Sequence, residues 1–104
     1  MITRDRNVIN IDAEGDFLDE TVAVQAIRFH SVPTLLMAVA EIREGSMGDK
    51  ELHFSLEARR GHPDYIGLPL APVWLHGGFK VTRFDSGRIT IYLAYSNRED
   101  DPIV

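Results

Sequence analysis

Residues 79–93 read FKVTRFDSGRITIYL, and this stretch indicates the fold class more strongly than any other part of the chain. Apolar and polar side chains alternate on both sides of Asp85-Ser86-Gly87, which is the pattern of two half-buried β-strands joined by a short turn. Gly87 suits a three-residue hairpin loop because glycine adopts a positive φ without steric cost. We therefore predict an antiparallel hairpin that pairs Phe84 with Arg88 and has an apolar face made of Phe79, Val81, Ile89, Ile91 and Leu93.

The same two-residue period occurs upstream and predicts further strands. Apolar and polar residues alternate through residues 51–60, and residues 73–84 are expected to be extended as well. Residues 8–11 have the pattern of a short leading strand. If these strands share one core, the side chains buried together include Phe54, Leu56, Val81, Ile89, Ile91 and Leu93.

Residues 17–44 give a more ambiguous pattern. Two apolar stripes follow helical spacing, one after Asp19 and one before Gly45: Val22, Ala23, Ala26, Ile27 and His30, then Leu35, Leu36, Val39 and Ile42. The β-branched residues of 21–24 and the unbroken apolar run 35–40 are also compatible with strands. We expect an α+β fold, with two helices packed on an antiparallel sheet of three to four strands. An all-β sandwich or barrel is the alternative.

Length and composition predict one folded domain. Of the 104 residues, 44% are hydrophobic and 26% are charged. These values are close to those of globular proteins and far from those of disordered chains. We expect a single domain over residues 1–104, in which residues 97–104 form a flexible tail because they combine several charges with a proline.

Composition also excludes or disfavours several classes of function. The chain has no cysteine, so disulfides, thiolate metal sites and cysteine nucleophiles are excluded. Its four histidines match no metal-ligand spacing and no cofactor motif is present, so we expect neither metal nor cofactor. The net charge is −5 and no basic face is evident, which disfavours nucleic-acid binding. No apolar run is long enough for a leader or a membrane span, so we expect a cytoplasmic protein that binds no membrane.

The proline-rich connection at residues 61–72, GHPDYIGLPLAP, is the main candidate for a functional surface. Loops of this length in small domains are often functional, although covering one end of the core is an equally good interpretation. Trp74 and His76 follow it and would share one side of an extended strand as a stacking platform, whereas a lone tryptophan is more often part of a core. Our candidate site for a ligand or partner comprises His62, Asp64, Tyr65, Trp74 and His76.

Two functional hypotheses follow from these residues. The first is a non-enzymatic binding or adaptor protein that acts through the proline-rich connection and a sheet face. We expect it to be a homodimer, because residues 65–70 carry more apolar surface than so small a chain readily hides. The second is a small enzyme or ligand-binding domain whose pocket, between residues 61–72 and the sheet, uses histidine and carboxylate side chains.

Overall fold

The computed structural model describes residues 2–30, 37–59, 62–67 and 71–94, and these residues form β-strands and no helix. The expected tail at residues 97–104 lies outside them. The strands are β1 (Ile2–Asp5), β2 (Val8–Ile11), β3 (Phe17–Leu18), β4 (Val22–His30), β5 (Met37–Glu44), β6 (Leu52–Arg59), β7 (Asp64–Gly67), β8 (Val73–Leu75), β9 (Phe79–Phe84) and β10 (Arg88–Leu93). The predicted α+β fold is therefore wrong, and the all-β alternative matches the structure.

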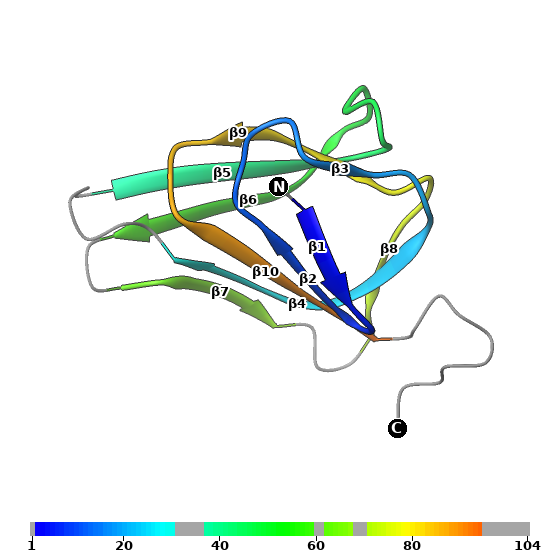
Figure 1. The fold of residues 1–104 in the computed structure, drawn as a ribbon, viewed down its shortest axis with the longest axis horizontal. Coiled ribbons are helices and arrows are strands. Elements are labelled where there is room, and N and C mark those ends of the chain that lie inside the picture. The colour runs from blue at the N-terminus through cyan, green and yellow to red at the C-terminus, as the bar shows by residue number, and fades with distance from the viewer. Residues whose placement is uncertain (1, 31–36, 60–61, 68–70, 95–104) are drawn as a thin grey trace.

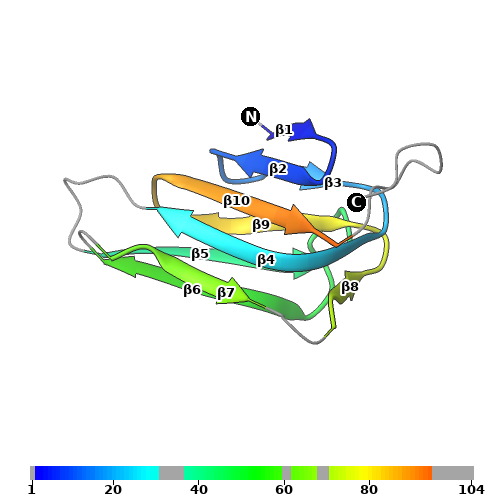
Figure 2. The same cartoon turned by 90° about the horizontal axis from the view of Figure 1, so that it is seen from below.

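Two antiparallel sheets pack face to face as a sandwich (Figures 1 and 2). Sheet A has the strand order β1-β2-β10-β4-β7, and β8 also pairs with β4; sheet B has the order β3-β9-β5-β6. The inner faces of both sheets contribute to one apolar core, and none of the described polar or charged residues is buried. The six side chains predicted to be buried together, Phe54, Leu56, Val81, Ile89, Ile91 and Leu93, all belong to this core.

A β-bulge explains why β4 resembles a helix in sequence. Val24 pairs with Leu93 and Ala26 pairs with Tyr92, so Gln25 is an extra residue in β4. A bulge of this kind shifts the two-residue alternation by one position. The inner-face residues of β4 are consequently Val22, Val24, Ile27 and Phe29, whose spacing partly imitates a helical stripe.

The second expected helix is β5, which alternates in the ordinary way. Ala38, Ala40 and Ile42 are fully buried, while the residues between them face outward. Small alanines on the inner face and Val39 on the outer face obscured this alternation in the sequence. Leu35 and Leu36, which contributed to the helical stripe, lie outside the described residues. Gly45 does have a positive φ of 87°, but it follows a strand instead of a helix.

The hairpin predicted for residues 79–93 is wrong in its pairing, although its faces are correct. β9 pairs with β3 and β5 in sheet B, whereas β10 pairs with β2 and β4 in sheet A. The turn Asp85-Ser86-Gly87 therefore passes between the sheets, with Gly87 at a φ of 99°. Asp85 attaches this turn to β5, because its N–H donates to Val39 O at 3.1 Å and its Oδ2 accepts the Val39 N–H at 2.9 Å.

The proline-rich connection is not a continuous loop, because it contains strand β7. β7 and β8 lie one after the other along the same edge of β4, opposite residues 26–29 and 22–24. Gln25, the bulge residue of β4, lies between these two paired segments. Prolines are acceptable here because an edge strand needs only every second N–H for its ladder. Pro63 and Pro72 directly precede the two strands.

A second turn between the sheets, at Gly77-Gly78, interrupts the extended segment expected over residues 73–84. Both glycines have a positive φ, 76° and 90°. A Cβ on Gly78 would lie 1.8 Å from the carbonyl oxygen of Leu18, so no larger residue fits at this position. The close approach places β9 beside β3 and ends β8 at Leu75.

Truncating a core side chain of β10 tests the shared core. Ile91 is fully buried in sheet A, so Ile91→Ala should lower the free energy of unfolding by about 2–5 kcal/mol through lost apolar burial and a cavity. Urea denaturation of the variant and of wild type measures this difference. Ser55→Ala, at an exposed position of β6, is the control and should change stability by less than about 0.5 kcal/mol. Equal denaturation midpoints for Ile91→Ala and wild type would contradict the core.

Candidate functional site

The outer face of sheet A carries a row of polar and aromatic side chains that crosses five strands. Strand register places Thr3 beside Asn10, Asn10 beside Thr90, Thr90 beside Arg28 and Arg28 beside Tyr65. The Thr90 hydroxyl donates a 2.9 Å hydrogen bond to the Asn10 side-chain oxygen. We call these five residues the outer row. It runs from edge strand β1 to edge strand β7 (Figure 1).

At the β7 end of the outer row, the ring of Tyr65 lies along the sheet. A Cβ on Gly67, two residues further along β7, would be 3.0–3.4 Å from ring and hydroxyl atoms of Tyr65, so the ring covers the glycine. The Arg28 guanidinium carbon is 6.0 Å from the ring centroid, within the range of a cation–π contact. Tyr65 nevertheless remains 58% exposed. Much of its aromatic surface is therefore accessible.

At the opposite end, the outer row reaches a cavity of about 210 Å³. Thr3 and Asn10 belong to both the row and the cavity lining, which also contains Ile11, Asp12 and Arg88. The lining thus combines a guanidinium, a carboxylate, an amide and a hydroxyl group. The cavity is smaller than the roughly 300–1,000 Å³ of pockets that enclose a drug-sized ligand. It can accept one end of a larger molecule.

The remaining part of this face is low in charge and includes small residues. Ala23 and Ala26 point outward from β4, and they are only 1% and 6% exposed. By strand register Ala26 lies between Tyr92 and Gly67, and Ala23 lies beside Trp74. Trp74 is 46% exposed, so it is not the core tryptophan that its type suggested.

The five residues of the sequence-based candidate site do not converge on one pocket. Asp64 fastens β7 to β6: its Oδ2 accepts the Glu57 N–H and its Oδ1 accepts the Tyr65 N–H, both at 2.8 Å. This contact joins the two sheets where β6 and β7 run side by side (Figure 2). His62 is exposed, and its backbone exchanges hydrogen bonds with Arg59. Neither Asp64 nor His62 lies on the outer row.

The expected platform of Trp74 and His76 does not form either. β8 ends at Leu75, and His76 belongs to the turn that leads into sheet B. Tyr65 and Trp74 are the two candidate residues that share the outer face of sheet A. Arg28, Asn10, Thr90, Thr3 and the cavity were missed, because their proximity depends on β10 lying between β2 and β4.

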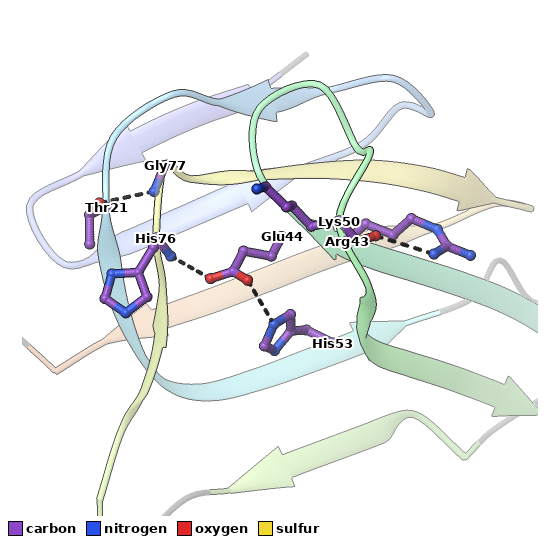
Figure 3. A network of polar contacts seen from close by, with 7 residues as sticks. All are labelled: Thr21, Arg43, Glu44, Lys50, His53, His76 and Gly77. Atoms are coloured by element: carbon purple, nitrogen blue, oxygen red, sulfur yellow. Dashed lines mark hydrogen bonds and ion pairs between the residues drawn. The ribbon is translucent and has the colours of Figure 1, made fainter.

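A carboxylate near the Gly77-Gly78 turn joins two histidines that the sequence did not associate. Glu44 Oε2 accepts the backbone N–H of His76 at 2.8 Å, and Glu44 Oε1 lies 3.2 Å from His53 Nε2 (Figure 3). The imidazole of His76 points away from the carboxylate in the same view. The Gly77 N–H donates to Thr21 Oγ1 at 3.0 Å. These contacts fasten the turn to the start of β4 and the end of β5.

Residues 2–30, 37–59, 62–67 and 71–94 provide neither a metal-binding cluster nor a membrane-spanning helix. Within these ranges, no group of three or more histidine, aspartate or glutamate side chains could hold a metal ion. They also contain no helix that is long and apolar enough to cross a membrane.

Searches of protein-family models, curated proteins and solved structures found no match to the chain.

Neutralising Glu44 should reveal its contribution to stability and its pH dependence. The His76 N–H and the His53 ring hold the pKa of Glu44 below its ordinary value of 4.5. A carboxyl whose pKa is lowered on folding stabilises the folded state above its ordinary pKa, and this stability is lost as the pH falls through the folded value. Glu44→Gln should therefore melt below wild type at neutral pH, and the gap should close below about pH 4.5.

Melting curves measured across a pH series test this expectation. Glu57→Gln is the control, since the Glu57 side chain forms an exposed pair with Arg59 on the surface of sheet B and its N–H contact with Asp64 is kept in the variant. Its melting temperature should stay closer to that of wild type at neutral pH. A gap for Glu44→Gln that is the same at every pH would show that the carboxylate charge is not involved.

Proposed function

We propose that this protein is a non-enzymatic binding domain whose binding surface is the outer face of sheet A. The observation that supports this proposal is the outer row, which places an exposed aromatic ring at one end and a polar cavity at the other. Functional binding sites typically combine apolar surface with a few convergent polar groups. The outer row combines both over a length of five strands.

The outer face of sheet B has a different character. Its charged side chains contact one another, as in the 3.4 Å pairs of Arg59 with Glu57 and of Arg83 with Asp85. Exposed pairs of this kind contribute little to stability and are typical of a solvated surface. The contrast between the two faces favours sheet A as the binding surface.

The enzymatic hypothesis has weaker support. Its best observation is the contact of Glu44 with His53, a carboxylate–imidazole pair that can serve general acid–base chemistry. Glu44 is also engaged by the His76 N–H at a turn, so a structural role accounts for it. His53, His62 and His76 line neither the cavity beside the outer row nor a second cavity bounded by residues such as Glu14, Lys80 and Thr82. We therefore favour binding over catalysis.

Photo-crosslinking in cell extract tests the binding surface and does not require an identified partner. p-Benzoylphenylalanine placed at position 65 should form adducts of increased mass, because the excited benzophenone inserts into nearby C–H bonds of any molecule. The same residue at position 17 is a matched control. Phe17 is 53% exposed on the outer side of sheet B, against 58% for Tyr65. Adducts that are absent, or equally abundant at both positions, would contradict the proposal.

We also propose that the protein is a homodimer, on the strength of the apolar residues of segment 65–70. Of these, Tyr65 is exposed and Ile66 packs partly against the core, while Leu68–Leu70 lie outside the described residues. Sedimentation equilibrium at micromolar concentration should give about twice the chain mass of 11.7 kDa. A mass of 11.7 kDa would contradict a homodimer and would leave the proposed binding surface unaffected.

A further inference from the structure

We propose that the Asp64 carboxylate closes the open edge of β6, and that without it β6 of one molecule pairs with β6 of a second copy of this chain. A strand at the edge of a sheet presents backbone N–H and C=O groups that can pair with a strand of another molecule. Such an edge is a latent interface. It is separate from the outer face of sheet A, so the proposed binding function does not depend on it.

Asp64 connects the edges of the two sheets at one corner of the sandwich. Within the described chain, β6 and β7 are the last strands of sheet B and sheet A, and they run side by side (Figure 2). Asp64 Oδ2 accepts the Glu57 N–H of β6, and Asp64 Oδ1 accepts the Tyr65 N–H of β7, each at 2.8 Å. One carboxylate therefore occupies a backbone donor of each edge strand.

The place opposite Glu57 is filled by this side chain and not by a strand. Of the described backbone next to β6, His62 pairs with this edge, and it does so at Arg59, where the strand ends. Two residues later the chain has joined sheet A, because Asp64 pairs with Phe29 of β4. Truncating the Asp64 side chain would consequently leave room for another strand beside Glu57.

The alternation of the β6 backbone extends this edge to Ser55. The N–H groups of Glu57 and Arg59 both point away from β5, since acceptors beyond the edge take both. The pairing of β5 with β6 is regular from Arg59 to Phe54, and in a regular antiparallel strand the N–H groups change sides at each residue. The N–H and carbonyl groups of Ser55 therefore point away from β5 as well.

A second copy of β6 is the partner that this edge fits. In an antiparallel pair centred on Ser55, the two Ser55 residues exchange hydrogen bonds, and Glu57 of each copy lies opposite His53 of the other. Phe54 and Leu56, which are both on the buried face of β6, also lie opposite each other. The register thus places apolar beside apolar side chains and brings no like charges together.

The other edge of sheet B also ends on a carboxylate. Gly15 and Asp16 pair with Val81 of β9 through backbone hydrogen bonds of 2.8 and 2.9 Å. Further along β9, the Phe84 N–H donates to Glu14 Oε1 at 3.2 Å. A charged side chain therefore occupies an edge N–H on both sides of sheet B. Charged side chains at sheet edges are one means by which natural proteins prevent edge-to-edge pairing.

Truncation of Asp64 tests the proposal through the mass of the protein in solution. In sedimentation equilibrium at equal concentrations, Asp64→Ala should have about twice the mass of wild type or more, whichever mass wild type has. Adding Ser55→Pro to this variant should restore the wild-type mass. Proline lacks an N–H, and the Ser55 N–H faces the open edge, so the substitution removes an edge donor and no hydrogen bond to β5.

Asp85→Ala is the matched control for the loss of a carboxylate that accepts a strand N–H. Asp85 Oδ2 accepts the Val39 N–H at 2.9 Å, but β5 lies between β9 and β6, inside sheet B. Its variant should have a lowered melting temperature and the mass of wild type. Asp64→Asn keeps one acceptor oxygen in place of two, so it should self-associate more weakly than Asp64→Ala. Should Asp64→Ala fail to fold by circular dichroism, the mass of Asp64→Asn decides.

Three results would overturn the proposal. The first is the wild-type mass for both Asp64 variants. The second is an equal increase in mass for Asp64→Ala and Asp85→Ala, which would assign the association to partial unfolding. The third is an increase that persists after Ser55→Pro, which would assign the association to another surface. The binding surface of sheet A is tested by crosslinking in a protein that retains Asp64, so none of these results bears on it.

Discussion

The pairing of β4 with three other strands is the constraint on which the rest of the structure depends. β10 occupies one edge of β4, and β7 and β8 share the other. The bulge at Gln25 keeps Val24 and Ile27 on the inner face although they are an odd number of positions apart. Without that extra residue, one half of β4 would turn its apolar side chains toward solvent. The placement of Tyr65 and Trp74 on the outer face depends on the same strand, because both residues pair with it.

Local alternation predicted which side chains are buried far better than it predicted which strands pair. Val81 and Ile91 were correctly assigned to the core, because a two-residue period identifies the apolar face of a strand whatever its neighbours are. The pairing of β9 with β10 was wrong, because a short turn containing glycine can close a hairpin or carry the chain to the opposite sheet. The hydrogen bonds between Asp85 and Val39 favour the second course. Val39 is 46 residues away in sequence, and no local pattern reveals it.

The two strands mistaken for helices failed for different physical reasons. In β4 the bulge shifts the period and places Ala23 and Ala26 on the outer face, which makes the segment apolar on both sides. In β5 the inner face consists largely of alanines, which carry little pattern because alanine is common in helices. The β-branched residues around Val22 were the correct signal, and they had less weight in the prediction than the apparent helical stripe.

The candidate site was predicted only in part, because its members meet through pairings between distant strands. Tyr65 and Trp74 were singled out as aromatic residues near prolines, whereas Arg28, Asn10 and Thr90 had no distinguishing sequence context. The contact of Glu44 with His53 depends on an irregularity in the pairing of β5 with β6. Ile42 pairs with Phe54 and Arg43 pairs with Leu52, so His53 is an extra residue that a regular two-residue alternation does not reveal. The roles of Asp64 and His76 in joining strands and turns depend on backbone geometry, which side-chain chemistry alone does not reveal.

β10 is the last strand of the described chain, yet it lies between β2 and β4 in the middle of sheet A (Figure 1). During synthesis, β2 and β4 must therefore wait with unpaired inner edges until residues 88–93 have left the ribosome. Thr90 and Asn10 are 80 residues apart in the sequence. Pairing strands that are so distant in sequence is slow, because the long loop between them has to close before any contact forms. A nascent chain stalled before Arg88 would expose two strand edges and be prone to aggregation. The outer row contains Thr90, so it exists only after this last strand has been inserted.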